Sequence, residues 1–281
     1  MTGADATLLR PGMRRLLLLA GVLVTLAGIQ LFVFSERTAE YFAWTIDPPL
    51  TAAFLGAAYF ASALFEFSAA REKLWAKARI SVPTVFVFTL TTMIVTLVHL
   101  DRFHLGAEFA AATRAVTWLW LVIYAVVPVA MAVLWWNQSR TPGVEPPRHV
   151  PLPVWLRVLT GAQALALLGV GSALLVVPVT VAEVWPWTLT PLTGRAIGAW
   201  LLSLGVAAAQ ALLEDDLRRL IPATWAYLGF AVLQTWALAR YPDDMAWGEP
   251  MAYAYLAFLA STVVVGAAAL GLIRRTRPAS V

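Results

Sequence analysis

The chain consists of long apolar runs separated by short polar segments. Eight of these runs are close to the length of about 20 residues with which an apolar α-helix crosses a bilayer. They cover residues 15–35, 51–70, 80–100, 115–136, 155–177, 194–213, 220–239 and 250–273. Apolar and polar positions do not alternate within them, as they do in the strands of a membrane β-barrel. The pattern therefore predicts an all-α integral membrane protein with eight transmembrane helices.

The first run begins like a signal peptide, because Arg14 and Arg15 precede a stretch of leucines. It continues to Phe34 without a small-residue cleavage site, and seven further runs follow. We therefore expect this segment to be retained as a helix.

A short motif occurs twice in the chain. Residues 39–46 and 182–189 share Ala, Glu, Trp and Thr at a separation of 143 positions, and Pro49-Leu50-Thr51 then matches Pro191-Leu192-Thr193. This repetition predicts a tandem duplication of a four-helix unit. The two repeats would occupy residues 1–136 and 154–281, joined by a proline-rich cytoplasmic linker at 137–153. Because four is an even number of spans, both repeats would enter the membrane in the same direction.

Composition agrees with a membrane protein, since 60% of the residues are hydrophobic and only 13% are charged. Soluble domains carry about 25% charged residues. The net charge of +4 comes from short basic clusters between apolar runs, so it indicates membrane topology and membrane lipids as partners, and no nucleic acid. The absence of cysteine excludes disulfide and thiol chemistry.

The positive-inside rule predicts the orientation of the chain. Most of the 20 lysines and arginines lie in the terminal segments and in the loops on the same side of the membrane, which places both termini in the cytoplasm. Arginine greatly outnumbers lysine, and Ala, Leu and Val dominate. This bias is typical of high-GC bacteria, so the expected location is a bacterial plasma membrane.

The repeated motif has two interpretations. Asp47-Pro48 and Thr190-Pro191 read as an N-cap followed by the first residue of a helix, and the aromatic residues around them suit the membrane interface. Alternatively, each carboxylate and its nearby tryptophan form a site for a cationic or amphipathic ligand, and the two copies can meet in one composite site. The candidate binding residues are Glu40, Trp44, Thr51, Glu183, Trp187 and Thr193.

Three ionisable residues in or near the spans are further candidates, namely Glu66, His99 and Asp101. Glu66 is expected either to pair with Arg71 or Lys73 or to relay protons. We expect no metal site and no cofactor, because the spacing of His99 and His104 does not place them on one face of a helix.

Other polar and small residues predict helix packing. Gln163 and Gln234 are expected to form hydrogen bonds between helices. Gly56 and Gly198 allow close approach of neighbouring helices, so the second and sixth spans should lie in the protein interior and face each other. The charged turn at 214–219 reads as solvated.

The segment from Trp185 to Thr193 has the form Trp-Pro-Trp-x-Leu-Thr-Pro-Leu-Thr. In this motif and in its general layout the chain resembles multi-pass membrane proteins of high-GC Gram-positive bacteria. Ala43 and residues 46–48 depart from the motif in the first copy. The resemblance implies a multi-pass membrane protein and brings no activity with it.

The chain lacks a phosphate-binding glycine loop, a His-Glu-x-x-His zinc motif and a Gly-x-Ser-x-Gly elbow. These observations favour a non-enzymatic membrane protein that binds or transports a small amphipathic molecule or lipid. One alternative is an accessory subunit or scaffold with a partner membrane protein, which predicts a packed interface between the second and sixth spans. A second alternative is an intramembrane enzyme, which requires a pocket with two ionisable groups within hydrogen-bonding distance.

Overall fold

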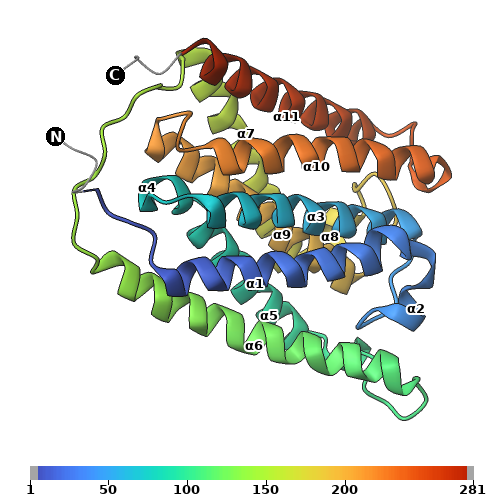
Figure 1. Ribbon diagram of the computed structural model, residues 1–281. Coiled ribbons are helices and arrows are strands. Elements are labelled where there is room, and N and C mark those ends of the chain that lie inside the picture. Colours follow the sequence, from blue (N-terminus) through green and yellow to red (C-terminus); the bar gives the residue numbers. More distant parts are fainter. Residues whose placement is uncertain (1–5, 277–281) are drawn as a thin grey trace.

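The computed structural model describes residues 6–276, which form a bundle of roughly aligned α-helices (Figure 1). The long helices are α1 (Pro11–Gly28, continued by the π-helix η2, Ile29–Val33), α3 (Pro49–Arg71), α5 (Ser81–Val98), α6 (Ala111–Ser139), α7 (Val154–Val176), α9 (Pro191–Glu214), α10 (Ile221–Arg240) and α11 (Pro250–Arg275). Short helices lie in the connections: η3 (Ser35–Arg37), α2 (Thr38–Tyr41), α4 (Trp75–Ala78), η4 (Leu100–Arg102), α8 (Pro178–Ala182) and η5 (Pro242–Asp244). Within residues 6–276 the only β pairings are two isolated bridges, so the prediction of an all-α protein is confirmed.

Seven helices in the described part of the chain are long and apolar enough to cross a membrane. The protein is therefore a multi-pass membrane protein. The run at 220–239 differs from the prediction, because it forms α10 but is not among these seven helices. Trp225, Tyr227 and Gln234 lower its hydropathy, and the helix packs its length against α3 and α11.

The second and sixth predicted spans are interior helices, as expected. Of the most apolar window of α3, 78% is buried, against 50% for α5 and α9 and 22% for α11. Helix α3 packs against α1 and α10, α9 packs against α7 and α5, and α3 and α9 touch over a short stretch. The centre of the bundle is thus built around α3, with α5 and α9 equally buried beside it and α11 on the periphery.

Two glycines bring the backbones of neighbouring helices into contact. A Cβ atom on Gly56 of α3 would lie 2.4 Å from the backbone nitrogen of Phe32 in η2. A Cβ atom on Gly198 of α9 would lie 2.9 Å from the carbonyl oxygen of Gly171 in α7. Only glycine permits these separations, because any side chain would overlap the adjacent backbone.

The linker between α6 and α7 is held by a network of charged side chains, in which the linker residue Glu145 is 51% exposed and the groups that it joins are more deeply buried. Arg79, beside α4, donates to Glu214 (Nη2 to Oε2, 2.7 Å) and to the linker residue Glu145 (Nη1 to Oε2, 2.9 Å). Arg219 also contacts both carboxylates and lies 3.6 Å from Asp216. Glu214, Asp216 and Arg219 are at most 3% exposed, so the expectation of a solvated turn at 214–219 is wrong.

Backbone geometry explains why this turn faces inward. Asp215 adopts a left-handed conformation, with φ of 44°, and ends α9. The carboxylates of Asp215 and Asp216 then accept hydrogen bonds from the backbone amides of Leu152, His149 and Val150. An extended linker without its own secondary structure has unpaired amides, and these two side chains satisfy them.

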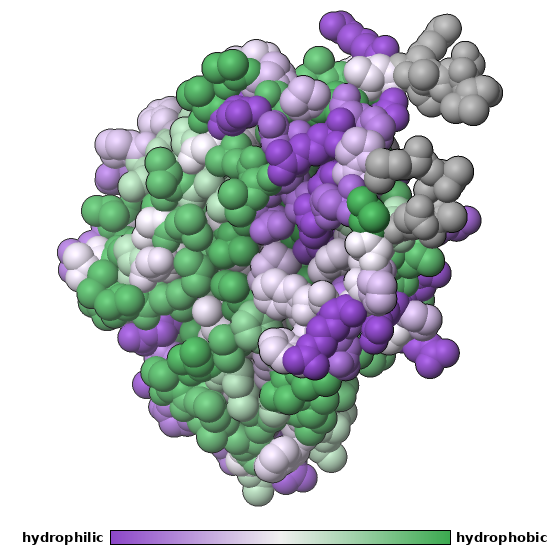
Figure 2. Space-filling view, turned by 90° about the vertical axis from the view of Figure 1, so that its left-hand side faces the viewer, coloured by the Kyte–Doolittle hydropathy of each residue, from purple (hydrophilic) through white to green (hydrophobic). Residues whose placement is uncertain are grey.

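Both described ends of the chain lie at the end of the bundle that carries this linker. Thr7 donates to the carbonyl oxygen of Val144, and Arg218 donates to that of Thr276. Figure 2 views this end and shows hydrophilic residues gathered between apolar flanks. We call it the linker end, and the opposite end, with residues 39–51 and 182–193, the motif end.

Candidate ligand-binding cavity

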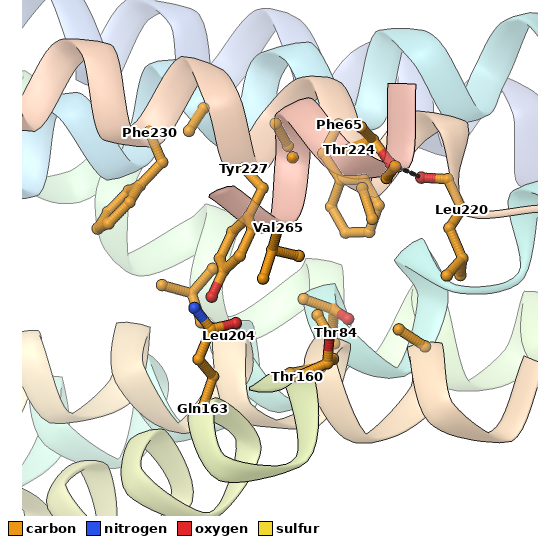
Figure 3. A pocket seen from close by; sticks show the side chains of 18 of the residues that line it. Phe65, Thr84, Thr160, Gln163, Leu204, Leu220, Thr224, Tyr227, Phe230 and Val265 are labelled. Carbon is orange, nitrogen blue, oxygen red and sulfur yellow. Dashed lines mark hydrogen bonds between the residues drawn. The ribbon is translucent and has the colours of Figure 1, made fainter. Parts of the chain in front are cut away.

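A cavity of about 100 Å³ lies inside the bundle, between α3, α7, α9, α10 and α11 (Figure 3). It exists because small side chains face one another where larger ones would close the space. These side chains include Ala58, Ala61, Ala207, Ala208, Ala223 and Ala226. Every residue in its wall is buried or half-buried. One water needs about 10–15 Å³ on this measure, and an apolar cavity of about 150 Å³ holds benzene. The present cavity is smaller than that but is only partly enclosed, so it can hold part of one small organic molecule.

The side-chain amide of Gln163, in the cavity wall, uses its nitrogen but not its oxygen in a hydrogen bond. Gln163 of α7 donates from Nε2 to Ser261 Oγ of α11 at 2.7 Å, which confirms its predicted interhelical role. Its carbonyl oxygen, Oε1, has no hydrogen-bond partner among the described residues, although the side chain is only 5% exposed. A strong acceptor is thus left free beside the cavity.

Tyr227 of α10 supplies a second free group. Its hydroxyl is buried and lacks a hydrogen-bond partner in the described part of the chain. Figure 3 shows Tyr227 and Gln163 reaching toward each other from opposite sides of the space. An acceptor and a hydroxyl group therefore face the same part of the cavity.

Three other hydroxyl groups of the wall donate to backbone carbonyl oxygens of their own helical segments. Thr224 donates to Leu220 O at 2.9 Å, Thr84 to Ile80 O at 3.0 Å and Ser203 to Trp200 O at 2.9 Å. Such bonds within a helix satisfy the hydroxyl hydrogen without a ligand. The wall of the cavity is mostly apolar, and its fully buried polar atoms without a partner among the described residues are Gln163 Oε1 and the Tyr227 hydroxyl.

Glu66 lies one turn beyond the cavity on α3 and is 1% exposed. Its Oε1 accepts from Ser62 Oγ at 3.1 Å, and its Oε2 has no partner within residues 6–276. The ion pair expected with Arg71 or Lys73 is not formed, because the carboxyl points into the bundle and both cations lie beyond the end of the buried segment. Ser62 lines the cavity, so it connects this carboxyl with the cavity wall.

The first copy of the repeated motif is split between surface and core. Glu40 is exposed and paired with Arg37 (Oε2 to Nη2, 2.6 Å). Trp44 is only 4% exposed and packs against Phe42 and Trp120. The rings of Trp44 and Phe42 are therefore buried within the protein and do not form an aromatic belt that faces lipid.

The second copy is divided in the same way. Glu183 is exposed, whereas Trp187 is 3% exposed and donates from Nε1 to Thr51 Oγ1 at 3.0 Å. This hydrogen bond joins the two copies of the motif, since Thr51 belongs to the first. A ligand site formed by the carboxylates and tryptophans stays a prediction.

The helix starts are only partly as predicted. Thr190 caps α9 and forms a capping box with Thr193. Asp47 does not cap α3; the backbone amide of Leu50 donates instead to Asp244 Oδ2 at 3.0 Å. Asp244 lies in η5, distant in sequence, which is why the local pattern pointed to the wrong aspartate.

His99 and Asp101 lie at the motif end, just after α5. His99 Nε2 is 2.8 Å from Nη1 of Arg195, at the start of α9, whereas Asp101 pairs with Arg102 on the surface. Because arginine only donates, His99 Nε2 must be the unprotonated acceptor. The contact joins segments 96 residues apart in sequence.

We expect this contact to weaken in acid. Partial burial and the charge of Arg195 lower the pKa of His99, against an opposing effect of Asp101. The neutral ring is favoured in the fold, so its stabilisation, about 1 kcal/mol, is complete above the unfolded pKa of about 6.5 and declines as pH falls below it. The measurement is the free energy of unfolding against pH for the wild type and for His99→Gln, which keeps an acceptor but does not titrate. A wild type no more acid-sensitive than this variant would contradict the assignment.

Comparisons with protein-family models, with curated proteins and with solved structures find no match to this chain. The functional argument therefore depends on the cavity itself. Sequence reasoning identified Gln163 and Glu66 as polar groups within spans but missed Tyr227. A tyrosine in an apolar helix gives no local signal that its hydroxyl will be left unpaired.

Proposed function

We propose that this membrane protein binds a small amphipathic molecule, largely apolar and with one hydroxyl-type polar group, in the cavity between α3, α7, α9, α10 and α11. The observation that carries the proposal is the pairing of an apolar wall with two unsatisfied polar atoms, Gln163 Oε1 and the Tyr227 hydroxyl. A ligand hydroxyl can donate to the first and accept from the second. A packed, dry interface, which the scaffold alternative predicts, would leave no such space.

The energetics favour a ligand of this chemistry. An unsatisfied polar group in the interior costs about 1–3 kcal/mol, so a ligand that pairs both groups recovers part of that cost. The apolar part of the ligand contributes about 25 cal/mol of binding free energy for each Å² of apolar surface that it buries. An apolar molecule of the same shape obtains only the second contribution.

We also propose that the cavity lies within a duplicated architecture of eight membrane-spanning helices, α10 included. Its support is a set of matching contacts: α1–α3 corresponds to α7–α9, and α3–α10 corresponds to α9–α5. The glycines match as well, since Gly28 and Gly171 each face a residue of the following long helix, Phe60 and Leu202. In this arrangement both termini and the linker are cytoplasmic in a bacterial plasma membrane.

The test uses 4-fluorobenzyl alcohol as a probe and ¹⁹F NMR of the purified protein in detergent as the readout. We expect saturable binding by the wild type. Gln163→Leu and Tyr227→Phe each remove a hydrogen bond of about 1 kcal/mol, so each should weaken binding about fivefold. Ala208→Phe fills the cavity and should abolish saturable binding.

Two controls separate the cavity from partitioning into detergent. Leu213→Phe adds the same ring on α9 at a position that is 70% exposed, and it should bind like the wild type. The probe 1-ethyl-4-fluorobenzene replaces the hydroxyl with a methyl group and should bind more weakly. Equal binding of both probes, or binding unaffected by Ala208→Phe, would refute the proposed site.

A further inference from the structure

We infer that Glu66 is a proton-binding site in the interior of the bundle, coupled through Ser62 to the cavity. The proton site stands on the surroundings of Glu66 alone, whereas the coupling rests on the proposed function. The two are therefore tested separately.

The surroundings of Glu66 are unsuited to a carboxylate anion. The side chain is 1% exposed, one oxygen accepts a single hydrogen bond from Ser62, and the other has no partner within residues 6–276. No cationic side chain in the described chain forms an ion pair with it. Burying an unpaired charge costs several kcal/mol, and one neutral hydroxyl donor does not offset this cost. Binding a proton from water at Oε2 removes the charge.

The helices packed around α3 bring few other ionisable groups to this region. Helix α5 contains none, and α6 contributes Tyr124, whose hydroxyl is 2.6 Å from that of Tyr59 on α3. Helix α1 contributes Arg14, which donates to the carbonyl oxygen of Glu72 at 2.9 Å. Helix α10 contributes Tyr227, in the cavity wall. Helix α9 contributes Glu214, which is paired with Arg79 and Arg219, and α4 contributes Lys77, which lies 3.8 Å from Glu72. Arg14 is thus bonded elsewhere, and the tyrosines supply no positive charge.

Ser62 gives the site a connection to the cavity. Its side chain lines the cavity, and its hydroxyl donates to Glu66 Oε1 at 3.1 Å. An ionised Glu66 is stabilised by water in the cavity, hydrogen-bonded to Ser62, whereas an apolar ligand displaces that water. Ligand binding should therefore favour the protonated carboxyl, and by reciprocity protonation should favour the ligand.

The proton site is tested first, without any ligand. Infrared spectra of the protein in lipid at neutral pH should contain the carbonyl stretching band of a protonated carboxylic acid. Glu66→Gln should remove the band, Glu66→Asp should shift it, and Glu40→Gln, which changes an exposed paired carboxylate, should leave it unchanged. A spectrum without the band, or a band that persists in Glu66→Gln, overturns the proton site whether or not the cavity binds a ligand.

The coupling is tested next, with 4-fluorobenzyl alcohol, which does not ionise in the working range. We expect its affinity for the wild type to fall about fivefold or more from neutral to alkaline pH. Glu66→Gln and Ser62→Ala should lose this dependence while still binding the probe. The same pH dependence in all three proteins overturns the coupling. Binding that fails in every protein while the infrared band is present refutes the proposed function and the coupling but leaves the proton site intact.

Discussion

Gly56→Ala should lower the free energy of unfolding by about 3 kcal/mol, which is the upper part of the range for overpacking in a well-packed interior. The new Cβ would lie 2.4 Å from the backbone nitrogen of Phe32 and 2.8 Å from the carbonyl carbon of Leu31. These are backbone atoms of η2, so no rotamer change relieves the overlap. Helix η2 must instead separate from α3. The measurement is reversible unfolding by SDS in mixed micelles.

A matched substitution controls for the effect of alanine itself. Gly169 lies within α7, and a Cβ atom there would meet nothing within 4 Å. Because alanine is the better helix former by about 1 kcal/mol, Gly169→Ala should leave stability unchanged or raise it. Equal effects at Gly56 and Gly169 would show that the close approach of η2 and α3 is not as described.

Arg219→Met should destabilise the protein by about 3–5 kcal/mol, because it removes one partner from a buried charge network. Arg219 is 3% exposed and contacts Glu145, Glu214 and Asp216. In this variant Glu214 still forms its ion pair with Arg79. Asp216 is only 1% exposed and loses its only cationic partner in residues 6–276. Detachment of the linker should accompany the loss, measured as faster proteolysis within residues 140–153.

The exposed pair at the motif end is the control for this prediction. Arg37 and Glu40 are 53% and 55% exposed, and such surface pairs contribute little to stability because solvent screens them. Arg37→Met should therefore have little effect on stability. Arg219→Lys should fall between the two, because lysine keeps the charge but lacks the two-pronged geometry of arginine. A small effect of Arg219→Met would mean that the network does not hold the linker.

The membrane class could be predicted from the sequence because apolar length alone decides it. Seven of the expected spans are helices long and apolar enough to cross a bilayer. The glycines at 56 and 198 correctly indicated close helix contacts in α3 and α9, but α5, which has no glycine, is as buried as α9. The sequence pattern overestimated how apolar α10 is, because this helix is not among the seven. One of its polar side chains is satisfied by neighbouring helices, since Gln234 donates to the Phe54 carbonyl oxygen at 3.0 Å and accepts from the Tyr255 hydroxyl at 3.1 Å.

The polar sites were less predictable, because their partners lie far away in the sequence. Glu145 meets Arg79 and Arg219 across 66 and 74 residues, so the charged turn at 214–219 could not be recognised as buried. The cavity had no sequence signal of its own. It depends on where alanines from separate helices face one another, which only the packing determines.

The most direct test of the ligand site is a crystal structure in lipidic cubic phase with 4-bromobenzyl alcohol, located by bromine anomalous scattering. Ligand binding in the cavity predicts a bromine peak among Ala58, Ala208 and Phe230, with the ligand hydroxyl hydrogen-bonded to Gln163 Oε1 and Tyr227. Bromine found only in the surrounding lipid, with the cavity empty or filled by water, would contradict it.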